Sequence, residues 1–162
     1  MISEWPKLRP ATNADCRLVA DLVYSVLAEY HLQPDPECTD ADLRDIEQSY
    51  FHRGGVFYVL EGQDGSIIGS YGLYPMQPGT CELRKMYLRR DHRGKGHGKR
   101  LLEDALASAR KLGFQRITLE TASVLKEAIR LYESYGFRPY QPDHLSCRCD
   151  QALLLDLTTA NQ

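Results

Sequence analysis

Some segments of this chain carry apolar residues at helical spacing, whereas others are short runs of β-branched and aromatic residues, and this difference separates predicted helices from predicted strands. After Thr12 apolar residues return every three or four residues, the spacing of one helical face, and Pro34 ends the segment. The same spacing predicts helices over residues 98–112 and 124–135. The predicted apolar stripes are Leu18, Val19, Leu22, Val23, Val26 and Leu27 in the first helix, and Leu101, Leu102, Ala105, Leu106, Ala109 and Leu112 in the second.

A more polar segment, residues 39–51, is predicted to form a further helix that stops at two glycines. Runs rich in β-branched and aromatic residues predict strands at 56–61, 67–74, 81–88, 117–120 and 151–157. The order is two helices, a three-strand meander, and then strands alternating with helices. It predicts an α/β fold with a mixed sheet and helices on both faces.

The composition fits one domain covering residues 1–162. The chain is 43% hydrophobic and 26% charged with a net charge of −2, which is ordinary for a globular protein and gives no overall attraction to nucleic acid. No apolar run approaches the roughly 20 residues of a membrane span, and the first residues do not resemble a signal peptide. We therefore expect a cytoplasmic protein that does not associate with membranes.

The five cysteines do not form a disulfide framework, because Cys16, Cys38 and Cys81 are isolated and the number is odd. Cys147 and Cys149 are the one close pair. A zinc site would need a second pair at suitable spacing, so no metal is expected. We expect the pair to lie in a strand, with both side chains on one face.

Basic residues are concentrated between Arg84 and Arg100, where eight Lys or Arg stand against one acid, Asp91. Within this cluster, glycines occupy the alternate positions 94, 96 and 98, directly before a predicted helix. Glycines let backbone amides approach a ligand closely, and a helix N-terminus favours an anion. The pattern predicts a phosphate site. It lacks the residues that a P-loop or a dinucleotide fingerprint requires.

The motif that does match is Arg-x-x-Gly-x-Gly, formed by Arg93, Gly96 and Gly98. Together with residues 87–102 around it and Ala-Ile-Arg-Leu-Tyr-Glu-Ser-Tyr-Gly-Phe at 128–137, it resembles the GNAT superfamily of N-acetyltransferases. The order of elements fits this superfamily over nearly the whole chain. The resemblance implies the GNAT-type acyl-CoA N-acyltransferase fold, acetyl-CoA as co-substrate, and an enzyme that acetylates an amine without a metal.

The resemblance also implies which residues hold acetyl-CoA. A pantetheine arm is expected to pair like an extra strand with residues 86–88, and a β-bulge there would free the Met86 amide to polarise the thioester carbonyl. One departure is Leu125, which stands where relatives often carry asparagine. The expected cofactor-binding residues are Met86, Tyr87, Leu88, Arg93, Gly94, Lys95, Gly96, His97, Gly98 and Lys99.

Thioester aminolysis needs a base for the amine and an acid for the leaving thiolate. Glu82 and Glu120 resemble the base positions of two branches of the superfamily, and Glu82 is preferred because its strand also carries the thioester contact. Either carboxylate could instead pair with an arginine or face solvent. Tyr132 matches the tyrosine that protonates the coenzyme thiolate in many relatives, with core packing as its alternative role.

The acceptor is expected to be a small-molecule or peptide amine that attacks directly in a ternary complex, and an acyl-cysteine route through Cys81 is disfavoured because nothing obvious activates the thiol. The acidic stretch 35–47 would suit a cationic amine or be a solvated helix face. Tyr30, Tyr50, Phe51 and Tyr74 would line the acceptor pocket or belong to the core. The competing hypotheses are a non-catalytic acyl-CoA sensor and a nucleic-acid binder, and we expect a monomer or homodimer without nucleic acid.

Overall fold

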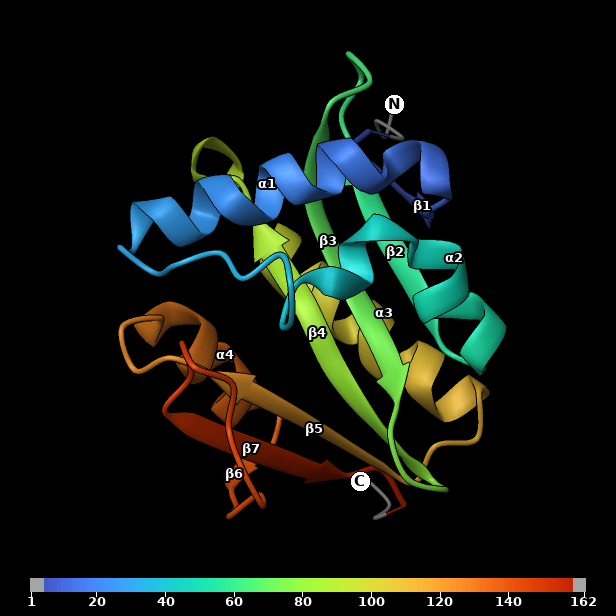
Figure 1. Cartoon of the computed structure of the whole chain (residues 1–162), viewed down its shortest axis with the longest axis vertical. Coiled ribbons are helices and arrows are strands. Elements are labelled where there is room, and N and C mark those ends of the chain that lie inside the picture. Colours follow the sequence, from blue (N-terminus) through green and yellow to red (C-terminus); the bar gives the residue numbers. More distant parts are fainter. Residues whose placement is uncertain (1–4, 159–162) are drawn as a thin grey trace.

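The computed structural model describes residues 5–158, which form one seven-stranded sheet with helices on both faces (Figure 1). The elements in chain order are β1 (Lys7–Pro10), α1 (Cys16–Glu29), α2 (Ile46–Ser49), β2 (Val56–Glu61), β3 (Ile67–Pro75), β4 (Thr80–Leu88), α3 (His97–Lys111), β5 (Arg116–Thr121), α4 (Lys126–Ser134), β6 (Arg138–Pro139) and β7 (Gln151–Asp156). The mixed sheet and the α/β class predicted from the sequence are confirmed.

The strands lie in the order β1-β2-β3-β4-β5-β7-β6, and every neighbouring pair is antiparallel except β4 and β5. These two parallel strands pair only where Thr80–Glu82 faces Arg116–Thr118. Beyond that point they diverge, and Figure 1 shows the open wedge between them. The wedge exposes the edges of both strands in the middle of the sheet.

Two hydrophobic clusters hold the helices to the sheet. Successive residues of β2 contribute to opposite faces of the sheet, because the side chains of a strand point alternately to its two sides. Phe57 and Val59 pack with α1, whereas Leu60 packs with α3 and α4. The predicted stripes of α1 and α3 are buried except for their end residues, Leu18 and Leu112, which are 45% and 43% exposed.

The helix predicted over residues 39–51 is wrong. This segment consists of two short 3₁₀ turns, Ala41–Arg44 and Phe51–Arg53, on either side of the single turn α2. The break lies at Asp45, whose backbone is extended and whose carboxylate accepts the amide of Gln48. An aspartate that caps a helix in this way interrupts any helix arriving from the N-terminal side.

The strands predicted between residues 56 and 157 agree with the structure to within one or two residues. The sequence did not predict β1 or the two-residue β6. The expected strand around Cys147 and Cys149 is also wrong, because both residues lie in the loop that precedes β7. Their place in that loop brings them to the wedge, as described next.

Candidate active site

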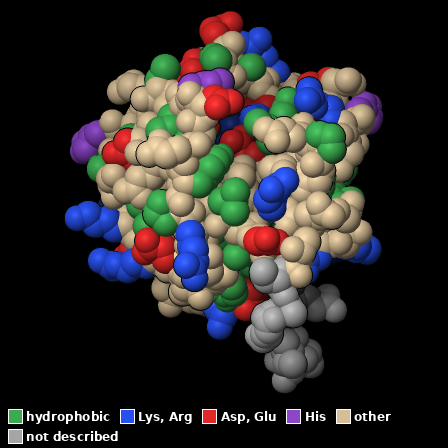
Figure 2. Space-filling view, turned by 90° about the horizontal axis from the view of Figure 1, so that it is seen from below, with side chains coloured by type: hydrophobic (Ala, Val, Ile, Leu, Met, Phe, Trp, Pro, Cys, Tyr) green, Lys and Arg blue, Asp and Glu red, His purple; other side chains and the backbone are tan. Residues whose placement is uncertain are grey.

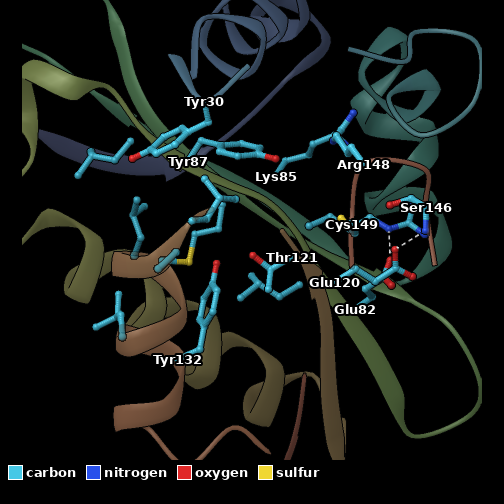
Figure 3. A pocket seen from close by; sticks show the side chains of 18 of the residues that line it. Tyr30, Glu82, Lys85, Tyr87, Glu120, Thr121, Tyr132, Ser146, Arg148 and Cys149 are labelled. Atoms are coloured by element: carbon cyan, nitrogen blue, oxygen red, sulfur yellow. Dashed lines mark hydrogen bonds and ion pairs between the residues drawn. The ribbon is translucent and has the colours of Figure 1, made fainter. Parts of the chain in front are cut away.

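A cavity of about 700 Å³ occupies the wedge between β4 and β5 (Figure 3). Its floor comes from β4, β5, the N-terminus of α3 and one face of α4. Two loops, at residues 35–39 and 144–149, complete the lining of the cavity. The cavity therefore connects the glycine-rich segment with both carboxylates and the tyrosine that the sequence singled out.

The glycine-rich segment forms the entry to α3 at one end of this cavity. Gly94 and Gly96 have φ angles of 76° and 87°, a region that other residues rarely adopt. A Cβ on either would meet no atom within 4 Å, so backbone conformation and not crowding requires glycine here. Gly96 is the N-cap of the 15-residue α3, whose first amides have no helical partner. Lys99 also lines the cavity, whereas Lys95 and His97 do not.

The electrostatic surroundings of this helix entry favour an anion. Burial, together with the charges of Arg100, His92 and Lys95, lowers the pKa of His97 below its ordinary value. His97 is therefore neutral at pH 7, and the positive potential comes from its neighbours and the helix dipole.

Arg93 is not directed at the open end of the helix. Its guanidinium pairs with the Glu29 carboxylate, with an Nη2–Oε1 distance of 3.0 Å, and lies near the hydroxyl of Tyr30. Its Nε and Nη2 also donate to the carbonyl of Leu88, at 3.0 and 2.8 Å. Arg93 thus fixes the end of β4 to the end of α1 and shapes the cavity wall beside the glycines.

The predicted β-bulge is present in β4. Ser70 pairs with Tyr87 and Gly72 pairs with Arg84, so Lys85 and Met86 together face a single residue of β3. Lys85 has a φ of 54°, an uncommon conformation for a residue with a Cβ. Its carbonyl accepts a 2.7 Å hydrogen bond from the buried Ser70 hydroxyl. This hydrogen bond holds the backbone of the bulge in place.

The Lys85 side chain is 4% exposed and enters a buried ion cluster above the bulge. Its Nζ donates to the Thr39 carbonyl at 3.0 Å and lies 3.1 Å from an oxygen of Asp42 and 3.4 Å from one of Asp40. Arg148 completes the cluster with two hydrogen bonds of 2.8 and 2.7 Å to Asp40. This contact ties the two cavity loops together.

The same cluster accounts for part of the acidic stretch 35–47. Burial by itself would raise the pKa of Asp40, but hydrogen bonds from Arg148 and the Asp35 amide, with the charge of Lys85, lower it overall. Asp42 also accepts the hydroxyl of the buried Tyr50. These two carboxylates are thus neither a solvated helix face nor free to bind a cationic amine.

The two candidate bases lie side by side at the other end of the cavity (Figure 3). Glu82 pairs across the strands with Thr118, so Glu120, two residues further along β5, lies on the same face. Glu82 is 8% exposed and forms an ion pair with the Nε of Arg84. Glu120 is half-buried and accepts the Ser146 amide at 2.9 Å. Within residues 5–158, Glu120 forms no ion pair.

The position of Tyr132 is compatible with both of the roles that the sequence left open. Its ring packs against Phe137 at 5.7 Å and is 6% exposed, while its hydroxyl points into the cavity (Figure 3). Among the described residues, none accepts a hydrogen bond from this hydroxyl. Burial raises the pKa of Tyr132 well above its ordinary value, so the hydroxyl remains protonated and has a hydrogen to offer to a group in the cavity.

Two cysteines near the site are poor nucleophiles. Cys81 is completely buried outside the cavity lining, and burial raises its pKa to about 12. Cys149 reaches the cavity, where burial, together with the charges of Glu120 and Glu82, also raises the pKa of the thiol. Since the thiolate is the reactive form, neither residue is suited to an acyl-cysteine intermediate.

Comparison with known proteins identifies the fold and family. The model of the acetyltransferase (GNAT) family matches residues 20–137. The chain belongs to this family. This GNAT chain is 40% identical over 137 residues to YjgM, an uncharacterized N-acetyltransferase of Escherichia coli; the match covers 82% of this chain and 81% of the relative.

Solved structures show the same GNAT fold. An acetyltransferase of the family from Staphylococcus aureus matches with a TM-score of 0.87 at 21% identity, covering 93% of this chain and 98% of that one. YncA from Salmonella typhimurium, solved with its cofactor acetyl-CoA, matches with a TM-score of 0.72 at 23% identity, covering 96% of each chain.

Sequence reasoning missed several residues of this GNAT site. Arg148 and Ser146 carried no signal, because each is an ordinary polar residue in an irregular segment. Lys85 was counted with the basic cluster near the phosphate loop, but its ammonium group lies in the ion cluster above the bulge. No local signal distinguishes it, because Lys85 directly follows Arg84 in a strand that also contains Glu82. Of residues 5–158, no helix is long and apolar enough to cross a membrane, and no group of side chains is arranged to hold a metal ion.

We expect the Ser70→Ala variant to test how the bulge is held. Loss of the hydroxyl leaves the buried Lys85 carbonyl without this partner, which should lower the free energy of unfolding by about 1–2 kcal/mol. Ser134→Ala is the matched control, because its hydroxyl also donates to a backbone carbonyl but at an exposed position. Urea denaturation of both variants measures the difference. Equal losses in the two would show that the bulge does not depend on Ser70.

Proposed function

We propose that this GNAT chain is an N-acetyltransferase that uses acetyl-CoA and acetylates an amine by direct attack in a ternary complex. The observation that carries the proposal is one continuous cavity that reaches the glycine-rich entry of α3, the bulged edge of β4, two carboxylates and a protonated tyrosine. A phosphate-binding end and a proton-transfer end in one cavity fit a group transfer between two bound substrates.

The residues of the wedge fit acetyl-CoA, which supplies the acetyl thioester. The amides of residues 94–99 at the start of α3 would hold the pyrophosphate, with Lys99 beside them. The diverging edge of β4 at Met86, Tyr87 and Leu88 would hold the pantetheine arm, because β5 does not pair with it there. Lys95 and His97 would act through their backbone, since their side chains lie outside the cavity lining.

We assign the general base to Glu120, in place of the sequence-based preference for Glu82. Glu82 already has a cationic partner in Arg84, whereas Glu120 accepts one backbone amide and forms no ion pair in residues 5–158. Glu120 would accept the proton of the amine as its nitrogen attacks the thioester carbon. When the carbon–sulfur bond breaks, Tyr132 would donate its proton to the leaving sulfur.

The presence of a base and an acid in the cavity favours catalysis over a non-catalytic acyl-CoA sensor. A sensor needs the phosphate loop and the wedge but has no use for a carboxylate and a protonated tyrosine directed at the same space. A nucleic-acid binder is disfavoured because Arg84, Lys85 and Arg93, three members of the basic cluster, are engaged in ion pairs within the fold.

A thermal-shift titration with acetyl-CoA tests the cofactor site. Ligand at one hundred times its dissociation constant should stabilise the fold by about 2.7 kcal/mol. For a domain of this size this corresponds to a rise in Tm of about 5–10 °C. Adenosine diphosphate is the control, because it offers the pyrophosphate without the pantetheine arm, and it should shift Tm less. No shift with saturating acetyl-CoA would contradict the proposal.

A further inference from the structure

Two arginines share the ring of Tyr74, and together they form only one ion pair with a carboxylate of the described residues. The Cζ atoms of Arg84 and Arg53 lie 3.8 and 4.6 Å from the centroid of the Tyr74 ring. Each guanidinium gains from the ring through a cation–π contact, but two like charges on one ring repel each other. An anion bound to Arg84 would relieve that repulsion.

Only one carboxylate of the described residues forms an ion pair with either arginine. Glu82 pairs with the Nε of Arg84, and Arg53 forms no ion pair in residues 5–158. The outer nitrogens of Arg84 lack strong hydrogen-bond acceptors. The Met76 sulfur lies 4.0 Å from Nη2, and no described residue accepts a hydrogen bond from Nη1. An arginine with this edge of its fork free can bind a carboxylate with two parallel hydrogen bonds.

Arg84 lines the same cavity as the candidate catalytic groups. Arg84 follows Glu82 by two residues on β4, so both side chains leave the same face of the strand. Arg84, Glu82 and Glu120 all line the cavity, and the Arg84 side chain is 27% exposed. Viewed from below, the surface is hollowed, and acidic and basic side chains lie together in the hollow (Figure 2). This end of the site offers one unpaired carboxylate and one incompletely paired guanidinium.

Such a site is complementary to a molecule with both charges. A polyamine would bring only positive charge beside Arg84 and Arg53. Asp40 and Asp42, which would have attracted a polyamine, already form ion pairs with Lys85 and Arg148. An amine that also carries a carboxylate can interact with both the Glu120 carboxylate and the Arg84 guanidinium.

We infer that the acceptor is a free amino acid whose carboxylate binds the outer nitrogens of Arg84 while its amine lies at Glu120; Arg53, which is outside the cavity lining, adds positive charge on the shared Tyr74 ring. This inference rests on the proposed acetyl transfer and gives that reaction a substrate class. Arg84 would act as a specificity-determining residue, because an acceptor without a carboxylate leaves the guanidinium edge unsatisfied in the cavity.

The test compares free amino acids with their α-amides, which have the same side chain and amine but no carboxylate. Across a panel of such pairs, wild-type kcat/KM should be about 10- to 100-fold higher for the acid than for the amide of the accepted pairs. Arg84→Gln should lower kcat/KM for the acid by a similar factor and leave the amide nearly unchanged. Arg84→Lys should recover part of the preference, because it keeps the charge but not the fork.

The amide arm separates carboxylate recognition from an effect through Glu82. Loss of Arg84 also removes the ionic partner of Glu82, and a disturbance of that carboxylate would lower kcat/KM for acid and amide alike. Arg53→Gln does not touch Glu82 and should give a smaller loss that is also confined to the acid. Arg110→Gln, at an exposed position on α3, is the control and should change neither substrate.

Failure of the inference can be distinguished from failure of the proposed function. If amides or amines without a carboxylate are acetylated as well as free amino acids, or if Arg84→Gln lowers both members of a pair equally, the inference is overturned while acetyl transfer stands. Amino acids that neither react nor raise Tm in the presence of saturating coenzyme A would also overturn it. Absence of any Tm shift with acetyl-CoA contradicts the proposed function itself.

Discussion

The Gly96→Glu variant should fold and lose measurable affinity for acetyl-CoA. The substitution places a carboxylate at the N-cap of α3, where the proposed site binds a pyrophosphate. Bringing two anions together in this way costs several kcal/mol, so we expect the dissociation constant to rise by at least about 1,000-fold. Isothermal titration calorimetry with acetyl-CoA measures the loss directly.

Gly96→Gln is the matched control for this variant. Gly96 has a φ of 87°, so any other residue is strained there by about 1–2 kcal/mol regardless of its charge. A Cβ at this position meets no atom within 4 Å, and the side chain itself should be accommodated. Both variants should therefore lose similar stability, and only the glutamate should abolish binding. Equal affinities of the two would show that the phosphate does not lie at Gly96.

The Glu120→Gln variant should lower kcat by about 100- to 10,000-fold, the range over which a general base contributes, while acetyl-CoA still binds. Glutamine keeps the size of the side chain and an oxygen that can accept the Ser146 amide, so the loop it anchors should remain in place. Steady-state kinetics with the best acceptor of the amino-acid panel provide the measurement. Glu82→Gln, the paired variant, should cost less, because Glu82 is already bound to Arg84.

The pH dependence distinguishes a base from a structural residue. Without a base the reaction depends on the neutral fraction of the amine, and that fraction grows about tenfold for each pH unit below the pKa of the amine. The rate of Glu120→Gln should therefore rise with pH more steeply than that of the wild type. A uniform loss at every pH, accompanied by a lower Tm, would indicate that Glu120 only anchors the loop. A larger loss for Glu82→Gln would transfer the role of base to that residue.

Most of the helices and strands were predicted because their signals are local. The stripes of α1 and α3 follow from helical spacing, and the strands β2 to β5 follow from β-branched and aromatic content, and each segment carries its signal by itself. The helix predicted at 39–51 failed because Asp45 interrupts it and because other polar residues of the segment have partners elsewhere in the chain. Asp40 and Asp42 are buried against Arg148 and Lys85, a fact that no local pattern records. Both cavity loops depend on such distant contacts.

By itself the sequence located the glycine-rich entry of a helix, which we propose as the phosphate-binding segment, since the three glycines and the helix start are contiguous in the chain. It also nominated Glu82, Glu120 and Tyr132, but it could not rank the two carboxylates. Only the tertiary structure decided that Glu82 is paired and Glu120 is not, and that the acidic stretch serves an internal ion cluster. The physical reason is that ion pairs and burial depend on distance in space. Asp40 and Arg148, 108 residues apart in the chain, meet only once the sheet and its loops have folded.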